Sequence, residues 1–107
     1  MSGERNLSNL KKKMAPRMHE GVFVYCTIPT GELPPGMTPI CSFQEDEGLT
    51  VIVEKAQAEA SGMAHVFEAR LITLTVHSSL EAVGLLATLA GRFSSAGIPC
   101  NVVSAFH

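Results

Sequence analysis

The C-terminal third of the chain constrains the fold most, because it has the pattern of a strand, a helix and a second strand in direct succession. Residues Leu71–Val76 alternate apolar side chains with threonine, and this period of two predicts a half-buried strand. A helix is predicted from Ser78 to about Ala96, and a second apolar strand over Ile98–Phe106. Two strands joined by a crossover helix are expected to be parallel and right-handed.

Both ends of this helix carry local signals. Ser78 and Glu81 have the spacing of a capping box, in which both side chains bind backbone N–H groups of the first turn. Gly97 is typical of the residue that ends a helix in a left-handed conformation, and Pro99 prevents continuation. The turn before the helix therefore gathers free N–H groups at the positive end of the helix dipole.

The side of the predicted helix that carries its polar residues also carries leucine and glycine. Leu85 falls inside its polar stripe, Leu89 borders it, and Gly84 and Gly91 lie seven residues apart on one flank. A slightly apolar surface helix is one interpretation, since single exposed leucines are common. The leucines and glycines together favour the other, contact with a neighbouring module through Gly84, Leu85 and Leu89. The apolar side comprises Leu80, Val83, Leu86, Ala87, Ala90 and Phe93, and the polar stripe comprises Glu81, Thr88, Arg92 and Ser95.

The rest of the chain predicts short elements separated by clear turns. Apolar and β-branched runs bounded by glycine, proline and acidic residues predict strands and one hairpin, and two short segments have helical spacing. The expected elements are a helix over Leu7–Met14 ended by Pro16, strands over Gly21–Ile28, Ile40–Gln44, Leu49–Glu54 and Val66–Val76, a loop over Pro29–Thr38, an acidic turn over Glu45–Gly48, and a helix over Lys55–Ser61.

Composition excludes several classes of protein. In the 107 residues, 46% hydrophobic and 17% charged residues indicate a folded globular chain. The net charge of −2 gives no general attraction to nucleic acid, and Lys11–Lys13 with Arg17 are expected on a solvated helix face. Neither a secretory signal nor an apolar run of membrane-spanning length is present. Three scattered cysteines, Cys26, Cys41 and Cys100, predict reduced, buried thiols in a cytoplasmic protein.

Catalytic and metal-binding patterns are lacking, so we expect neither an enzyme nor a cofactor. The acidic turn at residues 45–48 lacks the ligand spacing of a calcium loop, which favours a solvated hairpin turn. The histidines, His19, His65, His77 and His107, have no metal-ligand spacing, and no phosphate-binding loop or nucleophile elbow is present.

Several strings nevertheless resemble a known family. VHSSLEAVGL followed by AGIPCNVVSA is similar to the ACT domain, a small regulatory module of amino-acid metabolism, and more narrowly to small bacterial proteins of unknown function with two ACT-like modules in one chain. The earlier strings EGVFVYCTIP and PICSFQEDEGLTVIVEKA resemble the same proteins. The resemblance thus covers nearly the whole chain and implies a regulatory protein that senses an amino acid or another small ligand.

The resemblance implies an α+β fold: a ferredoxin-like ACT-type sandwich whose antiparallel-rich sheet carries helices on one face. Two modules are expected, residues 1–65 and residues 66–107. In the family a further strand and helix follow the second strand of a module, and that strand lies between the first two. The second module is therefore expected to be incomplete, with the gap closed by residues absent from the chain, by the N-terminal strand near Phe23, or by a second copy.

The resemblance also implies where a ligand binds. ACT modules commonly bind ligands at the turn between the first strand and the helix, against the second strand of the same or a partner module. By position, these residues are His77, Ser78, Ser79 and Leu80 in the turn and Asn101, Val102 and Val103 in the second strand. The alternative is that Ser78 only caps its helix and Asn101 only satisfies a turn. Two function classes follow: a non-catalytic module that binds a small molecule, and a structural module that only assembles, in either case as a homodimer.

Overall fold

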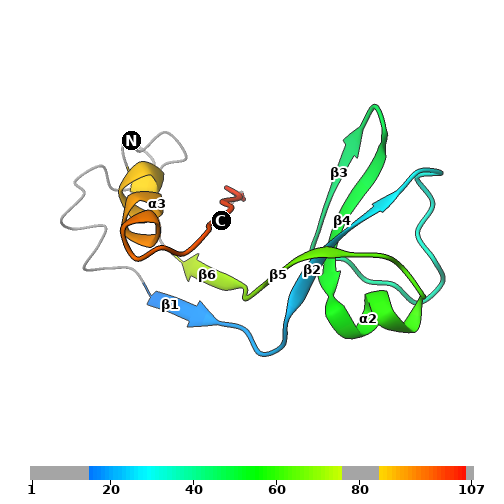
Figure 1. The fold of residues 1–107 in the computed structure, drawn as a ribbon, viewed down its shortest axis with the longest axis horizontal. Coiled ribbons are helices and arrows are strands. Elements are labelled where there is room, and N and C mark those ends of the chain that lie inside the picture. The colour runs from blue at the N-terminus through cyan, green and yellow to red at the C-terminus, as the bar shows by residue number, and fades with distance from the viewer. Residues whose placement is uncertain (1–14, 76–84, 106–107) are drawn as a thin grey trace. The chain divides into compact units, whose positions relative to one another are not determined.

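The computed structural model describes residues 15–75 and 85–105, and every structural statement below concerns these ranges. The chain divides into two compact units, which we call the sheet unit (residues 18–73) and the helix unit (residues 1–17 and 74–107). Figure 1 labels the elements. They are β1 (Ala15–Met18), β2 (Phe23–Ile28), β3 (Cys41–Glu45), β4 (Gly48–Glu54), α2 (Lys55–Ala60), β5 (Val66–Ala69), β6 (Ile72–Thr75) and α3 (Leu85–Ser95).

A four-stranded antiparallel sheet forms the centre of the sheet unit, in the order β3-β4-β2-β5. β3 and β4 form a hairpin in which Glu45 pairs with Gly48, so that only Asp46 and Glu47 lie in the turn. β2 pairs with β4 over its whole length, from Phe23 opposite Glu54 to Ile28 opposite Leu49. β1 and β6 form a separate two-stranded sheet.

The core of the sheet unit lies on one face of this sheet. Side chains in a strand alternate between faces, and Val24, Cys26 and Ile28 of β2 point to the same side as their cross-strand neighbours Val51 and Val53. Helix α2 packs against β2 and β4 on this side, as Figure 1 shows, and its Ala58 is fully buried. Buried Met37 and partly buried Leu49 and Met63 complete the cluster.

The two described helices, α2 and α3, end in the same hydrogen-bonded motif. At the end of α3, Ile98 donates its N–H to the carbonyl of Phe93 at 2.9 Å and Gly97 donates to Ser94 at 2.9 Å, with Gly97 at φ 75°. α2 ends in the same way, with Gly62 at φ 67°. These are Schellman motifs, which satisfy the last carbonyl groups of a helix and require a left-handed residue that glycine supplies without strain.

A clamp around His19 joins the segment before β2 to the segment after β5. The N–H of His19 donates to the carbonyl of Leu71 at 2.9 Å, and the guanidinium of Arg70 donates to the carbonyl of His19 at 2.8 Å. The His19 Nε2 lies 2.8 Å from the hydroxyl oxygen of Thr73. This clamp fixes the end of β5 next to Ala69.

Most of the local predictions for the sheet unit are confirmed. The buried strand predicted over Gly21–Ile28 is β2, and the predicted hairpin with its acidic turn is formed by β3 and β4. Helix Lys55–Ser61 is α2, and Pro29–Thr38 is a loop. The helix predicted to end near Ala96 does so, because α3 runs to Ser95 with Gly97 at its left-handed end.

Two strand predictions are wrong. The long strand predicted over Val66–Val76 is broken at Arg70 and Leu71, because β5 pairs with β2 whereas β6 pairs with β1. Of the strand predicted over Ile98–Phe106, residues 98–105 form no strand, so the predicted parallel crossover is not formed there. A strand needs a neighbour for its N–H and C=O groups, and no described strand pairs with this segment.

The remaining differences and untested predictions concern β1, the N-terminal helix, the capping box and the module boundaries. β1, which contains Pro16, was not predicted as a strand. The predicted helix Leu7–Met14 and the capping box Ser78–Glu81 lie outside the described residues. The module boundaries at residues 65 and 66 stay a prediction.

Candidate functional site

The predicted ligand turn lies between a strand and a helix, but its own residues are not described. β6 ends at Thr75 and α3 begins at Leu85 among the described residues. His77, Ser78, Ser79 and Leu80 lie outside them, as does Gly84. The structure therefore gives the two elements on either side of the turn and leaves its geometry a prediction.

The three residues assigned to the second strand of the site are described, and their backbone differs from the prediction. Asn101, Val102 and Val103 are exposed and belong to no strand. Val102 and Val103 keep 46% and 54% of their surface accessible, which is unusual for adjacent valines. They lie in an accessible segment rather than in a sheet.

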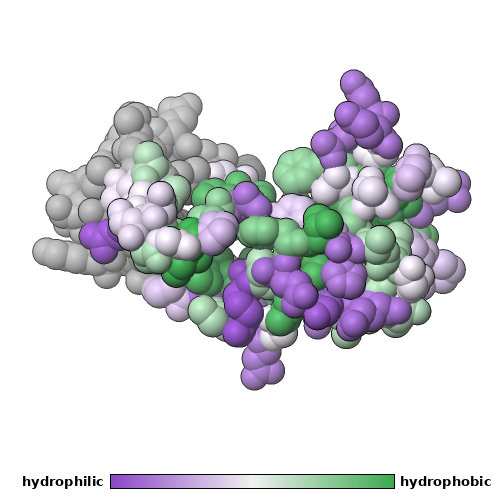
Figure 2. Space-filling view, in the orientation of Figure 1, coloured by the Kyte–Doolittle hydropathy of each residue, from purple (hydrophilic) through white to green (hydrophobic). Residues whose placement is uncertain are grey.

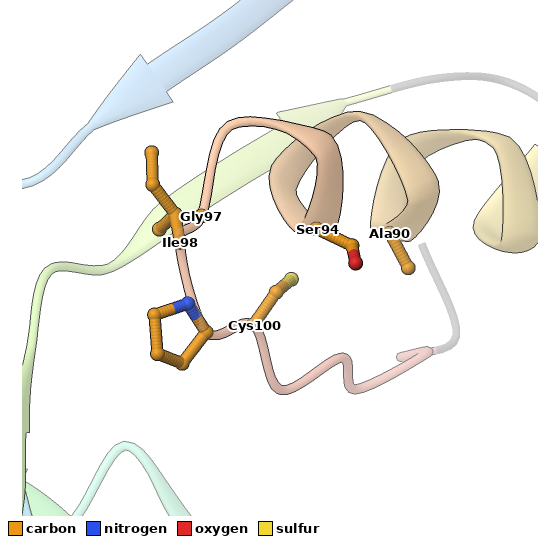
Figure 3. Close-up of a pocket in the computed structure, with 6 residues that line it drawn as sticks. Ala90, Ser94, Gly97, Ile98 and Cys100 are labelled. Atoms are coloured by element: carbon orange, nitrogen blue, oxygen red, sulfur yellow. The ribbon is translucent and has the colours of Figure 1, made fainter.

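A shallow, open hollow of about 430 Å³ lies at the C-terminal end of α3, within the helix unit. The helix contributes Ala90 and Ser94, and the chain that turns back after the Schellman motif contributes the rest. In Figure 3 the side chains of Ala90, Ser94 and Cys100 point into a common space. The lining residues are Ala90, Ser94, Gly97, Ile98, Pro99 and Cys100.

The chemistry of this hollow is nearly neutral. It offers one hydroxyl, from Ser94, one thiol, from Cys100, and otherwise apolar groups and backbone. None of the described residues that line it is charged, so these residues offer no cation to pair with a carboxylate ligand. From the sequence, Gly97 and Pro99 were recognised only as the end of a helix. The path of the chain back over Ser94 depends on backbone geometry, which no sequence motif predicts.

The three cysteines are free thiols with different environments. Cys26 is buried in the core of the sheet unit, and this burial raises the pKa of its thiol, which therefore stays protonated and unreactive at neutral pH. Cys41 is half-buried. Cys100 is exposed, because the segment that carries it is not part of a sheet, so the prediction that all three are buried holds fully only for Cys26.

Within residues 15–75 and 85–105, no three metal-ligating side chains gather at one point. His65 lies with its Nδ1 3.3 Å from the carbonyl of Met63, and His19 belongs to the clamp described above. The same ranges contain no helix that is both long enough and apolar enough to cross a membrane.

The acidic hairpin turn is a solvated tip. Glu45, Asp46 and Glu47 are all exposed, and the hydroxyl of Thr50 donates a hydrogen bond to the Glu45 carboxylate. Figure 2 shows a strongly hydrophilic projection at the end of the β3–β4 hairpin. This agrees with the predicted solvated turn.

The predicted contact surface on α3 is partly described. Leu89 is half-buried, together with Ala90 and Phe93, whereas Ala87 is exposed. A side chain on Gly91 would meet nothing within 4 Å among the described residues. The assignment of Gly84, Leu85 and Leu89 to an interface stays a prediction.

Comparison with known proteins shows which family the chain is similar to. A family model described as the ACT domain matches residues 2–70. The crystal structure of a Vibrio cholerae protein of unknown function, described as a possible transport protein, is similar with a TM-score of 0.81. The two sequences are 39% identical over 94% of this chain and 78% of the other. No curated protein matches the chain. The fold is thus α+β, of the ferredoxin-like ACT type.

Proposed function

The chain belongs to the ACT-domain family, and from this membership we propose that it is a regulatory module that binds an amino acid and catalyses no reaction. ACT domains generally bind small molecules for regulation. The family match, which covers residues 2–70, is the observation that carries the proposal. An amino acid, rather than another small ligand, is the finer part of the proposal and comes from the resemblance of the strings around residues 76–85 to modules of amino-acid metabolism.

The proposed binding site is the turn His77–Leu80. One observation and one principle support it: in the chain the turn lies between β6, which ends at Thr75, and α3, which is described from Leu85, and N–H groups at a helix start attract a carboxylate. The second part of the site is Asn101–Val103, whose exposure leaves it accessible to a ligand. Asn101 would offer an amide donor and acceptor to the ligand's amino and carboxylate groups.

We expect one or more free amino acids to raise the melting temperature of the protein. A ligand that binds only the native state stabilises it by mass action, by about 2.7 kcal/mol at a ligand concentration of 100 times Kd. For a chain of this size the shift is roughly 10 °C. A thermal-shift screen of the standard amino acids, followed by calorimetry, measures it.

Two variants of the same residue separate binding from capping. Ser78→Tyr fills the turn and should abolish the ligand-induced shift, whereas Ser78→Ala should lower the ligand-free stability by about 1 kcal/mol through loss of the cap. Ser95→Tyr, at an exposed serine of the same helix, is the matched control and should keep the full shift. No shift with any standard amino acid would remove the amino-acid proposal.

We also propose that the protein is a homodimer, either in support of ligand binding or as its whole function. ACT domains commonly dimerise, and the sequence places Leu85 and Leu89 beside polar helix positions. We expect light scattering at micromolar concentration to give a dimer mass, and Leu85→Asp to give a monomer mass because a charge in an apolar interface is unfavourable. Leu33→Asp, at an exposed loop leucine, should leave the mass unchanged. A monomer mass for the unmodified protein contradicts this proposal.

A further inference from the structure

β5 contains one residue more than a regular ladder with β2 accommodates. Ala69 pairs with Phe23 and Val66 pairs with Tyr25, so two residues of β5 lie opposite the single residue Val24. This is a β-bulge, which bends the strand and leaves one residue unpaired.

The bulge places a large aromatic residue where the backbone suits glycine. Phe67 has φ 57°, and it is the only non-glycine residue with positive φ among those described. A left-handed residue at the first bulge position is normally glycine, because a Cβ is strained there. The ring of Phe67 packs edge-on against Tyr25, with ring centroids 5.6 Å apart and planes at 81°.

Both ends of the bulged segment are fixed. On one side the His19 clamp holds Arg70 and Leu71 beside the Ala69–Phe23 pair. On the other side the Schellman motif at Gly62 ends α2, and Met63 donates its N–H to Ala58 at 2.9 Å. The extra residue therefore has to be accommodated either in the bulge or by an advance of the start of β5 by one position along β2.

We propose that β5 is a register switch, which exchanges between this bulged form and a regular form. In the regular form Ala69 keeps its pairing with Phe23, Phe67 adopts an extended backbone opposite Tyr25, and Val66 moves from Tyr25 to Cys26. β5 thereby gains one paired position, and the connection between Gly62 and Val66 has to reach one residue farther along β2. The exchange conserves the pairing at Ala69 and needs no rearrangement of β2, β3 or β4.

Three features bring the two forms close in free energy. Straightening the strand removes the left-handed strain at Phe67. The aromatic pair with Tyr25 is kept, because directly opposed residues of antiparallel strands share a face. Val66, which is 68% exposed in the bulged form, turns to the face that carries the core, since a slip of one residue moves a side chain to the other face. Two costs oppose these gains: Glu68 comes to lie opposite the fully buried Val24, on the face that carries the core, and the connection after Gly62 has to reach farther along β2.

The switch changes what the sheet presents at its edge. Among the described strands, β5 is an edge of the four-stranded sheet, and a bulge in an edge strand prevents regular pairing with a further strand. In the regular form β5 offers an unbroken row of backbone donors and acceptors. The bulged form is thus the closed state of this edge and the regular form its open state.

Relaxation-dispersion and saturation-transfer NMR on the full chain test the proposal. We expect microsecond-to-millisecond exchange at the amides of β5 and at Tyr25 and Cys26, with a minor population of roughly 0.1–10%. The Cα shift of Phe67 in the minor state should have the extended-strand value. Amides of the β3–β4 hairpin serve as the internal control and should show no such exchange.

Two substitutions remove the ring, but only one relieves the backbone strain. Phe67→Gly stabilises the bulged form and should lower the minor population by about five- to thirtyfold, which removes the dispersion. Phe67→Leu keeps the strain and should keep the exchange. Protection of the β3–β4 amides from hydrogen exchange verifies that both variants are folded.

Three results would overturn the switch. The first is the absence of exchange at β5 in the unmodified protein. The second is a minor state in which Phe67 keeps the Cα chemical shift of a left-handed residue. The third is equal exchange in the folded Phe67→Gly and Phe67→Leu variants, because the strain at Phe67 would then play no part.

Discussion

Gly48→Ala is expected to destabilise the protein more than any other single methyl group added at a described glycine. A Cβ at Gly48 would lie 2.8 Å from the carbonyl oxygen of Ile28 and 2.9 Å from the Cα of Pro29, and both are backbone atoms that cannot rotate away. Gly48 also has φ 142°, a conformation that is nearly exclusive to glycine. We expect a loss of roughly 2–5 kcal/mol, from backbone strain and steric overlap together.

Urea unfolding measures this loss, and Gly62→Ala is its matched control. Gly62 also has positive φ, at 67°, but a Cβ there meets nothing within 4 Å. Gly62→Ala should therefore cost only the strain, roughly 1–2 kcal/mol. Equal losses of unfolding free energy in the two variants would contradict this prediction, because the close approach of Ile28 and Pro29 to Gly48 would then add no steric cost.

Val53→Ala is expected to have the second largest effect. Val53 is fully buried, and its register partner Val24 is fully buried beside it. Removing two methyl groups loses about 0.8 kcal/mol of burial for each and leaves a cavity, so the total loss is about 2–3 kcal/mol. The midpoint of urea unfolding should fall while the slope stays unchanged.

Val66→Ala is the control for burial, because Val66 is a strand valine with 68% of its surface exposed. Its effect should stay within about 0.5 kcal/mol. The double variant Val24→Ala with Val53→Ala should deviate from additivity, since the two side chains share one part of the core. A loss at Val66 as large as at Val53 would contradict the assignment of the core to the α2 face.

The sequence predicts those parts of this fold that depend on neighbouring residues. The acidic turn that ends in Gly48 and the helix ends at Gly62 and Gly97 carry local signals, because glycine alone adopts these backbone conformations easily. The burial of β2 follows from its β-branched and aromatic run. These elements occur where the pattern places them.

Features that depend on distant partners are not predictable in this way. Nothing at Arg70 or Leu71 signals a break; the strand divides there because the clamp to His19 redirects it. Residues 98–105 are as apolar as a strand, yet a strand forms only beside a partner. Phe67 favours an extended backbone by its residue type, so its left-handed conformation has no sequence signal.

The same limit applies to the candidate site. The strand before the ligand turn and the helix after it were predicted from periodicity, and the structure contains both β6 and α3. The hollow at the other end of α3 was not predicted, because it arises where the chain folds back from Ser94 to Cys100. Predicting it would need the path of the backbone after Gly97.

The acidic tip of the hairpin has a consequence for the behaviour of the protein in concentrated solution. In the part of the chain that the structure describes, β3 is the other edge of the four-stranded sheet, and its Phe43 is half exposed, a combination that invites edge-to-edge aggregation. Glu45, Asp46 and Glu47 place negative charge at the end of this edge. Two copies that pair in parallel through β3 bring like charges together, and this repulsion is screened over about 8 Å at physiological ionic strength. The carboxylates therefore oppose the growth of sheets between molecules. Because salt screens their charge, colloidal stability should decline as salt is added.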